Sequence, residues 1–343
     1  MLDYKKTGTF LASKRKQAQM TQADVAQKLG VSFQAVSKWE NGTLPFPEIP
    51  HPVLVLKSEE PGSKQKLAME YGYSESICHD MINHLVNDIM VMGARPLAVL
   101  DTIVCGSAEK ETIKSFIKGI SDACRENGCS LVGGETSIQP QVVEKGVYVL
   151  TSSIAGILSK DKVIDGSGIT EGDTVLAVAS NGLHTNGYSL VRMLMDQMPQ
   201  IKLEKIDGET FIEQIMKPHT TYRNAIVNLL EYPGIHGMAH ITGGGIQGNL
   251  CRILPDGLYA DIDLSKIKTL PIFRYIQRIG NIDEAEMLST FNCGVGLIVV
   301  VSERYAEQAI RNIAKYHDCY EIGRIRKGSG KVLFRNSVNW ESL

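Results

Sequence analysis

Residues 97–136, "LAVLDTIVCGSAEKETIKSFIKGISDACRENGCSLVGGET", combine the patterns of a strand, a helix and a second strand. The apolar run 97–104 is short and bounded, as in a buried strand, whereas 111–128 has the spacing of a helix with one apolar face. Residues 130–136 form another short apolar run that contains two glycines. Alternating strands and helices joined by glycine turns are typical of α/β or α+β domains. The stretch predicts that architecture for the body of the chain.

The same alternation continues on both sides of this stretch. We expect further strands at 52–56, 173–180, 259–265 and 295–301, and a further helix at 81–93. A turn-rich segment near 166–172 separates two such blocks. The prediction is therefore a multidomain chain in three parts: a small all-helical head at 1–45, a first α/β part at 46–168 and a second at 169–343.

The composition is that of an ordinary globular protein. The chain has 343 residues, of which 43% are hydrophobic and 22% charged. Its seven cysteines show no paired metal-binding spacing, and no segment has the pattern of a secretory leader. No apolar run approaches the roughly 18 residues of a membrane span. We expect a soluble, cytoplasmic protein without membrane contacts.

Charge is distributed unevenly along the chain. The net charge is −2, but the first 42 residues carry seven basic and three acidic side chains. A basic head on an acidic body indicates that the head is the part suited to a polyanion. The alternative is a lysine face that is simply solvated.

The head has the pattern of three short helices. The first is expected over about 9–19, with Phe10 and Leu11 as apolar anchors. Thr21 and Asp24 have the spacing of a capping box at the start of the second. That helix should bury Val25, Ala26 and Leu29 and end at Gly30, after which Ser32 caps the third helix.

The third helix should turn Val36 and Trp39 inward and a polar face outward. The stretch 20–42, "MTQADVAQKLGVSFQAVSKWENG", resembles the Cro/repressor (XRE-type) helix-turn-helix family, in which such a helix enters the DNA major groove. The alternative is a helical bundle that contacts other proteins. Family domains usually continue for two more helices, whereas a proline-rich linker follows here. The expected DNA-binding residues are Gln22, Ser32, Phe33, Gln34, Ser37, Lys38 and Asn41.

Several polar groups of the body have a possible chemical use. Asp88, Asp101 and Glu135 could share Mg²⁺, which takes one or two carboxylates together with nucleotide phosphates. The glycines of "HITGGG" (240–245) could let backbone amides approach a phosphate at a helix start. His184 could transfer a proton. Singly, each has an ordinary structural explanation as a cap, a turn or a satisfied histidine.

In this order, these stretches resemble aminoimidazole ribonucleotide synthetase, the PurM-type cyclo-ligase family, and the resemblance continues through "MLSTFNCGVGLIV" and "EIGRI". It implies a homodimer whose subunits have two α/β halves. It also implies that Mg-ATP activates the formyl oxygen of formylglycinamidine ribonucleotide before ring closure. The implied catalytic residues are His184 and Asn186, and Asp88 and Glu135 are implied at the metal. Asp101 completes the expected metal ligands as the third of the carboxylates above. The implied cofactor-binding residues are Ser63, Lys64, Asn87, Asp88, Gly133, Gly134, Glu135, Thr242, Gly243, Gly244 and Gly245.

The chain departs from that family at two places. The family's Asp-Gly-Val-Gly-Thr-Lys loop is "EEPGSK" here, residues 59–64. Glu60 adds a charge that repels phosphate by about 1 kcal/mol, and Pro61 removes an amide donor. The family's glycine-rich segment that closes over ATP is absent, and the helix-turn-helix occupies its place. The ATP and Mg²⁺ site is therefore expected to be weakened.

Two functional hypotheses follow. The first is a transcription regulator whose body senses a phosphorylated purine intermediate or a nucleotide, and whose dimer reads an inverted-repeat operator. The alternative is a working phosphoribosylformylglycinamidine cyclo-ligase that carries a DNA-binding head. A purely structural or protein-interaction role is the third class.

Overall fold

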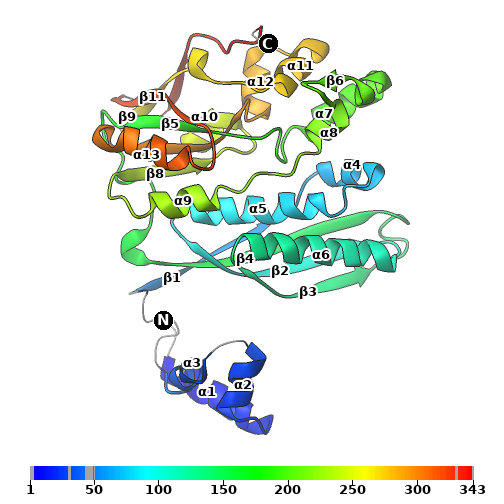
Figure 1. The fold of residues 1–343 in the computed structure, drawn as a ribbon, viewed down its shortest axis with the longest axis vertical. Coiled ribbons are helices and arrows are strands. Elements are labelled where there is room, and N and C mark those ends of the chain that lie inside the picture. The colour runs from blue at the N-terminus through cyan, green and yellow to red at the C-terminus, as the bar shows by residue number, and fades with distance from the viewer. Residues whose placement is uncertain (1–3, 30–31, 43–48, 50, 329–330, 342–343) are drawn as a thin grey trace. The chain divides into compact units, whose positions relative to one another are not determined.

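The computed structural model describes residues 4–29, 32–42, 49, 51–328 and 331–341. The chain forms two compact units, one of residues 1–53 with 158–161 and one of residues 54–157 with 162–343. They are called the head and the body below, and Figure 1 labels their elements. No described helix combines the length and hydrophobicity needed to cross a lipid bilayer.

The head consists of helices α1 (Tyr4–Gln17), α2 (Gln22–Leu29) and α3 (Phe33–Glu40). The capping box is confirmed: Asp24 N–H donates to Thr21 Oγ1 (3.1 Å), and Thr21 N–H donates to Asp24 Oδ2 (2.7 Å). Ser32 caps α3, since its hydroxyl accepts from Ala35 N–H at 3.2 Å. Ala26 and Val36 are buried as expected.

The prediction for α1 was wrong in two respects. The helix starts at Tyr4, and Phe10 and Leu11 are 59% and 42% exposed rather than buried. Gly8 packs against the end of α3 instead, where an added Cβ would lie 2.6 Å from the Trp39 carbonyl oxygen. So close an approach leaves no room for large apolar anchors. Gly30 and the side chain of Leu29 lie outside the described residues.

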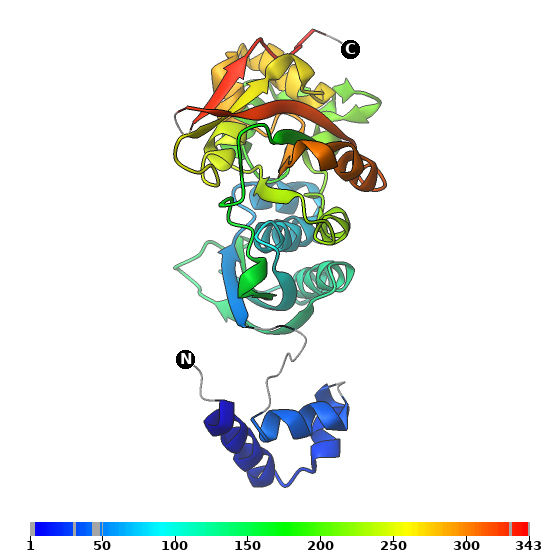
Figure 2. The same ribbon diagram turned by 90° about the vertical axis from the view of Figure 1, so that its left-hand side faces the viewer.

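The first half of the body contains a four-stranded sheet with the order β1-β4-β2-β3. Strand β2 pairs parallel with β3 and antiparallel with β4. Helix α5 lies between this sheet and the second half, with α6 beside it (Figures 1 and 2). The elements are β1 (Pro52–Glu59), α4 (Lys64–Tyr71), α5 (Ser76–Met90), β2 (Arg95–Cys105), α6 (Lys110–Glu126), β3 (Ser130–Ile138) and β4 (Tyr148–Ser159).

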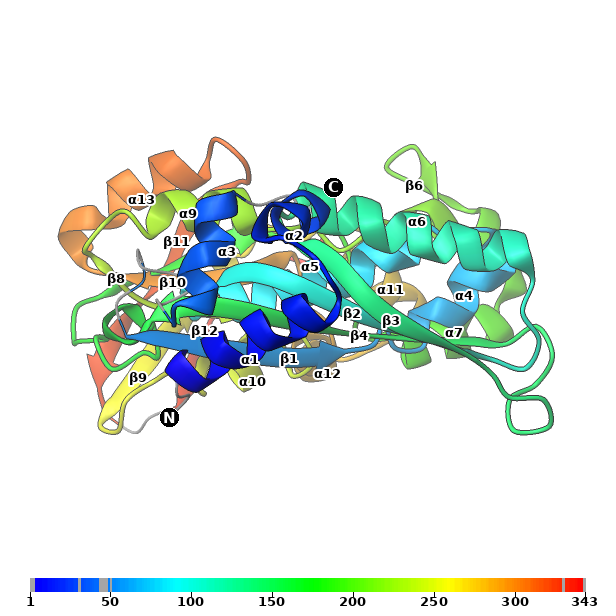
Figure 3. The ribbon, with the colours of Figure 1, turned by 90° about the horizontal axis from the view of Figure 1, so that it is seen from below.

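Figure 3 views the four-stranded sheet from the side away from α5. Exposed apolar side chains lie on this outer face. Leu54, Leu56 and Leu100 are 59%, 74% and 53% exposed. They share one face, because Ser58 of β1 contacts Ser153 of β4, which is paired with Leu100 of β2. Within the body, the described outer face thus carries several exposed apolar side chains.

The second half contains a six-stranded sheet with the order β12-β9-β11-β5-β10-β8. Strand β10 is buried along its whole length and pairs antiparallel with both neighbours. The strands are β5 (Thr174–Ala179), β8 (Ile235–His240), β9 (Leu258–Asp263), β10 (Val295–Val301), β11 (Cys319–Lys327) and β12 (Val332–Arg335). A hairpin of β6 (Lys205–Ile206) and β7 (Glu209–Thr210) adds a small second sheet.

Seven helices flank these strands among the described residues: α7 (Tyr188–Gln197), α8 (Phe211–Ile215), α9 (Arg223–Leu229), α10 (Gly245–Leu250), α11 (Pro271–Gly280), α12 (Glu284–Thr290) and α13 (Ala306–Ile313). The predicted mixture of an all-helical head and an α/β body is confirmed. Every strand expected from the sequence is present.

Candidate active site

One face of α5 carries a stripe of polar residues: Asp80, Asn83, His84, Asn87 and Asp88. Their spacing of three or four places them on one side of the helix. Asp80 accepts from His219 N–H at 2.7 Å, and Asn83 donates to the His219 carbonyl at 2.7 Å. The stripe therefore fixes the backbone of His219, which belongs to the second half. Sequence reasoning missed Asp80 and Asn83, although polar residues at helical spacing within an apolar helix were a usable signal.

Asn87 takes part in the same docking. It is fully buried, donates to the Thr220 carbonyl at 2.9 Å and accepts from Tyr222 N–H at 2.9 Å. Its carbonyl and amide groups are thus both engaged inside the protein. In this conformation Asn87 holds a backbone segment rather than facing a cofactor.

Lys64 is also fully buried. Its ammonium group donates to Asp80 (2.8 Å), the His184 carbonyl (3.0 Å) and the Lys217 carbonyl (2.7 Å). Three donors are all that an ammonium group has. Burial raises the pKa of Asp80 to about 6 and lowers the pKa of Lys64, while their mutual attraction opposes both shifts. Lys64, expected at a cofactor, is an internal tether here.

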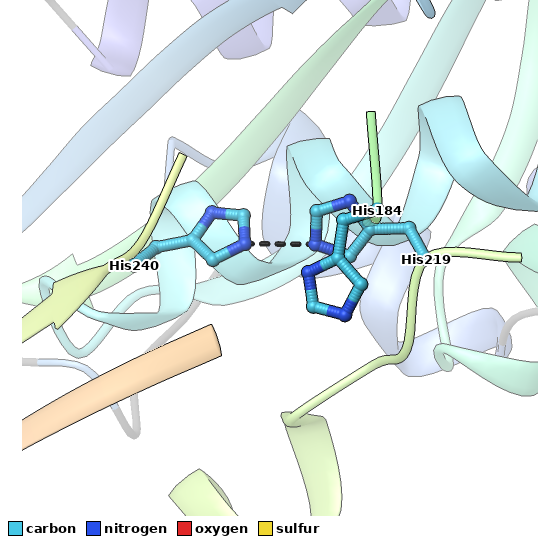
Figure 4. Close-up of side chains that lie close together, drawn as sticks. All are labelled: His184, His219 and His240. Carbon is cyan, nitrogen blue, oxygen red and sulfur yellow. Dashed lines mark hydrogen bonds between the residues drawn. The ribbon is translucent and has the colours of Figure 1, made fainter. Parts of the chain in front are cut away.

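Four histidines gather beside this stripe: His84, His184, His219 and His240. The rings of His184 and His219 are stacked with centroids 3.9 Å apart, and Nε2 of His219 lies 2.8 Å from Nε2 of His240 (Figure 4). Nδ1 of His240 lies 2.7 Å from Asp88 Oδ1. Since the carboxylate only accepts, His240 donates through Nδ1 and turns the lone pair of Nε2 toward His219.

His184, expected to be catalytic, is 1% exposed, and among the described residues neither of its ring nitrogens has a hydrogen-bond partner. A neutral imidazole has one N–H, and leaving such a donor buried without an acceptor costs about 1–3 kcal/mol. Burial, and next the charge of His240, lowers the pKa of His184 well below its usual value. The ring is therefore neutral, and something other than a described side chain would have to satisfy it.

An open cavity of about 530 Å³ adjoins the histidines. Asp88, His240, Asn186 and Thr242 are among the residues that line it. Although burial opposes ionisation, the hydrogen bond from His240 and nearby positive charges hold the pKa of Asp88 below its usual value. This cavity, called the imidazole cavity below, thus presents a carboxylate, an imidazole, an amide and a hydroxyl.

Thr242 and Gly243, the first two residues of the turn 242–245, line that cavity. Gly245 has φ +59° and would place a Cβ 1.9 Å from the Leu288 carbonyl oxygen, so only glycine fits. The amides of Gly244 and Gly245 donate to the Ser289 and Thr242 carbonyls. Of the turn expected to bind phosphate, Thr242 and Gly243 therefore line the cavity. The amides of Gly244 and Gly245 are already bonded to carbonyls of the chain.

A second open cavity, of about 430 Å³, lies along β3 and is called the carboxylate cavity below. Asp101, Gly133, Gly134 and Glu135 are among its lining residues. A Cβ on Gly134 would lie 2.1 Å from Asp101 Oδ1, so glycine is required for the carboxylate to fit there. Burial raises the pKa of Asp101.

The three expected metal ligands are not brought together. Asp88 lines the imidazole cavity, whereas Asp101 and Glu135 line the carboxylate cavity. The described groups able to hold a metal are His184 with His219 and His240, and His84 with Asp88 and His240. Asp101 lies within β2, where it pairs with both Gly134 and Ser152. Ser63 precedes α4 without capping it.

Comparisons with known proteins agree with this architecture. The AIR synthase related N-terminal domain matches residues 54–158, the corresponding C-terminal domain matches 170–336, and a helix-turn-helix family matches 11–47. Phosphoribosylformylglycinamidine cyclo-ligase of Bacillus cytotoxicus is 41% identical over 84% of each chain. That of Methylobacillus flagellatus is 42% identical over 88% of this chain and 85% of its own.

Among solved structures, a hydrogenase maturation protein HypE in complex with ATP matches 82% of this chain and 81% of its own, with a TM-score of 0.61 and 17% identity. At that identity, the likeness shows the fold alone. The identities with the cyclo-ligases, together with the two matching domains, show that the chain belongs to the AIR synthase related family and carries a helix-turn-helix segment ahead of it.

Proposed function

We propose that the body is an ATP-dependent phosphoribosylformylglycinamidine cyclo-ligase. The observation that carries the proposal is the presence of two open cavities with distinct polar linings in a chain 41–42% identical to proteins of that name. The sequence analysis placed a ligand sensor first, and these relatives favour the enzyme instead.

The carboxylate cavity fits Mg-ATP by its chemistry. Carboxylate oxygens such as those of Asp101 and Glu135 suit a hard cation, and glycine backbone lets phosphates approach closely. When bound, Mg-ATP would supply the phosphoryl group that activates the substrate's formyl oxygen. Asp101 and Glu135 would hold the cation, and Gly133 and Gly134 would leave room for the phosphates.

The imidazole cavity fits the substrate. Asn186, Thr242 and Gly243 line it and offer donors to a phosphorylated ribose. His240 and Asp88 line it too. Both ring nitrogens of His240 are engaged, Nδ1 with Asp88 and Nε2 with His219, and the side chain of His184 is buried, so we assign proton transfer to neither ring.

We infer that the body is a homodimer that joins through the outer face of the four-stranded sheet. This face exposes Leu54, Leu56 and Leu100, and β3 is an edge strand of the sheet. Uncovered apolar faces and free strand edges promote association. A dimer of bodies carries two heads, which suits an inverted-repeat operator.

We infer that the head binds DNA through α3. Phe33, Gln34 and Lys38 are exposed on it, and so is Asn41 at its C-cap. Two other expected contacts are engaged within the head: Gln22 donates to Glu40 at 2.7 Å, and the Ser32 hydroxyl accepts from Ala35. The base-reading part of the surface is therefore narrower than expected. A selection from random duplex DNA should return an inverted repeat, and a selection without any enriched motif would refute this role.

Steady-state ADP release with formylglycinamidine ribonucleotide and Mg-ATP tests the enzyme. Turnover on the order of 10 per second, typical of enzymes, is expected. The second candidate, a sensor without turnover, is favoured by Glu60 and Pro61 in the altered loop and by the internal engagement of Lys64. It predicts no ADP release and a change of operator affinity when the substrate is added.

A further inference from the structure

Half of the chain's eight histidines lie in one cluster, and they come from four separate segments. His84 belongs to α5, His184 precedes α7, His219 lies in the segment docked on α5, and His240 ends β8. The ring centroids of His219 lie 3.9 Å from His184, 4.9 Å from His240 and 5.3 Å from His84. A hydrogen bond between two rings needs only two imidazoles, but the fold brings four together here.

We propose that His184, His219 and His240 bind one divalent first-row transition-metal ion of the Zn²⁺ class. One ring nitrogen from each of the three lies within 4.8 Å of the others. Tetrahedral zinc with Zn–N bonds of about 2.0–2.1 Å needs nitrogens about 3.3 Å apart. Nε2 of His219 and Nε2 of His240 are 2.8 Å apart, so these two rings need to separate by only about half an ångström.

Asp88 and His240 have the arrangement of a carboxylate that orients a metal-binding histidine. The bond from His240 Nδ1 to Asp88 Oδ1 fixes the tautomer of the ring. Nε2 of His240 then faces His219, as Figure 4 shows. Metal-bound histidines almost always donate their second N–H in this way. His240 is therefore already prepared as a ligand.

Vacant nitrogens supply the independent evidence for an ion. Both ring nitrogens of His184 and Nδ1 of His219 are buried without a hydrogen-bond partner among the described residues, and both side chains are at most 1% exposed. Ordinary buried histidines find partners. An ion bound at Nε2 of His219 and Nε2 of His240 would also use a lone pair that the chain leaves unused on His184.

The backbones of the three histidines are held in place. His219 is bonded at its amide by Asp80 and at its carbonyl by Asn83, and the His184 carbonyl accepts from Lys64. His240 also lines the imidazole cavity, which gives an ion a route from solvent. Neutral imidazoles favour zinc, copper, nickel and cobalt over magnesium and calcium. The site is thus distinct in chemistry from the carboxylate cavity.

The neighbouring group of His84, Asp88 and His240 is less suitable for a cation. The ammonium group of Lys57 lies 3.2 Å from Asp88 and 3.0 Å from Glu59. It already supplies the positive charge that an ion would bring, so the ion would have to displace it. We therefore place the ion among the three buried rings.

Cobalt titration tests the proposal, because Co²⁺ bound tetrahedrally by imidazoles has strong visible absorption and free Co²⁺ does not. The full-length protein, without a histidine tag and treated with chelator, should bind one Co²⁺ per chain with those bands. His219→Gln and His184→Gln should each weaken binding by at least about a hundredfold, and Asp88→Asn by about ten- to a hundredfold. Zn²⁺ should abolish the Co²⁺ spectrum.

His79→Gln is the matched control, because His79 pairs with Glu126 on the surface, outside the cluster, and this change should leave Co²⁺ binding intact. Circular dichroism of each metal-free variant checks folding, and two ligand variants are used so that one unfolded variant does not decide the test. Absence of tetrahedral bands in the wild-type protein would overturn the proposal. So would Co²⁺ binding that the folded cluster variants and His79→Gln share equally.

Discussion

The polar residues of α4 and α5 differ from the carboxylates of the carboxylate cavity in whether they bond to the chain itself. Lys64, Asp80 and Asn87 are fully buried and bond to atoms of the chain, which docks the second half on α5. Asp101 and Glu135 instead line an open cavity. The family resemblance predicted Lys64, Asn87 and Glu135 alike as cofactor-binding residues. Hydrogen bonding within the chain therefore distinguishes Lys64 and Asn87 from Glu135, which the sequence motifs did not.

The largest expected effect is a loss of stability when the buried pair of Lys64 and Asp80 is broken. Asp80→Asn should lower the free energy of unfolding by about 3–5 kcal/mol, because it leaves the Lys64 ammonium buried without its counter-charge. Urea denaturation measures this change. Glu111→Gln, which breaks an exposed pair with Lys114, is the control and should change stability by less than about 1 kcal/mol. Equal losses of stability in the two variants would contradict a structural role for the buried pair of Lys64 and Asp80.

Substitution of Asp101 in the carboxylate cavity should have the opposite pattern, a large loss of activity with little loss of stability. Asp101→Asn should lower the rate of ADP formation by about a hundredfold or more, because the carboxylate proposed to hold the Mg²⁺ of Mg-ATP is lost. Its free energy of unfolding should stay within about 1 kcal/mol of wild type, since this carboxylate belongs to no described ion pair. Asp122→Asn on the surface of α6 is the control. Wild-type turnover in Asp101→Asn would exclude the carboxylate cavity from catalysis.

Much of this architecture follows from the sequence alone. The short apolar runs predicted the strands, and Thr21 with Asp24 predicted the start of α2. The anchors Phe10 and Leu11 failed because tight packing at Gly8 decides which face of α1 is buried, and periodicity does not report that contact.

The site was only partly predictable. Asp88 and Asp101 are 13 positions apart along the chain, but the turn from α5 into β2 sends their side chains to different cavities. His84 and His219 are isolated histidines in the sequence, so no local pattern predicted them as site residues. Only the docking of residues 217–222 on α5 places their rings in contact. Such long-range pairing leaves no local pattern in the sequence.

The head provides the same contrast between open and engaged groups. Gln34→Ala should relax base preference by about 1–3 kcal/mol at one position, because its exposed amide is free to reach a base edge. Lys38→Ala should weaken binding to all sequences and reduce the salt slope by about one. Gln22→Ala should instead lower the stability of the head, since Gln22 is bonded to Glu40. Competition binding to the selected operator and its single-base variants measures these effects, and a relaxed base preference in Gln22→Ala would reverse the assignment.

The smallest effect is expected at the altered loop. Glu60→Gly combined with Pro61→Val should tighten Mg-ATP binding by about fivefold, because it removes a repulsion of about 1 kcal/mol and restores an amide donor. Glu70→Gln on α4 is a matched loss of charge outside the loop and should leave the affinity unchanged. Weaker binding in the loop variant would mean that Glu60 and Pro61 support the nucleotide site.

Calorimetric titration with Mg-ATP of two variants tests the central distinction most directly. Lys64→Met with Asp80→Asn removes both buried charges together and so avoids leaving one unpaired. If Lys64 is an internal tether, this folded double variant binds Mg-ATP within about twofold of wild type, whereas Asp101→Asn binds at least about tenfold more weakly, equivalent to about 1.4 kcal/mol. The account is contradicted if the double variant loses as much affinity as Asp101→Asn, or if Asp101→Asn keeps the affinity of the wild type.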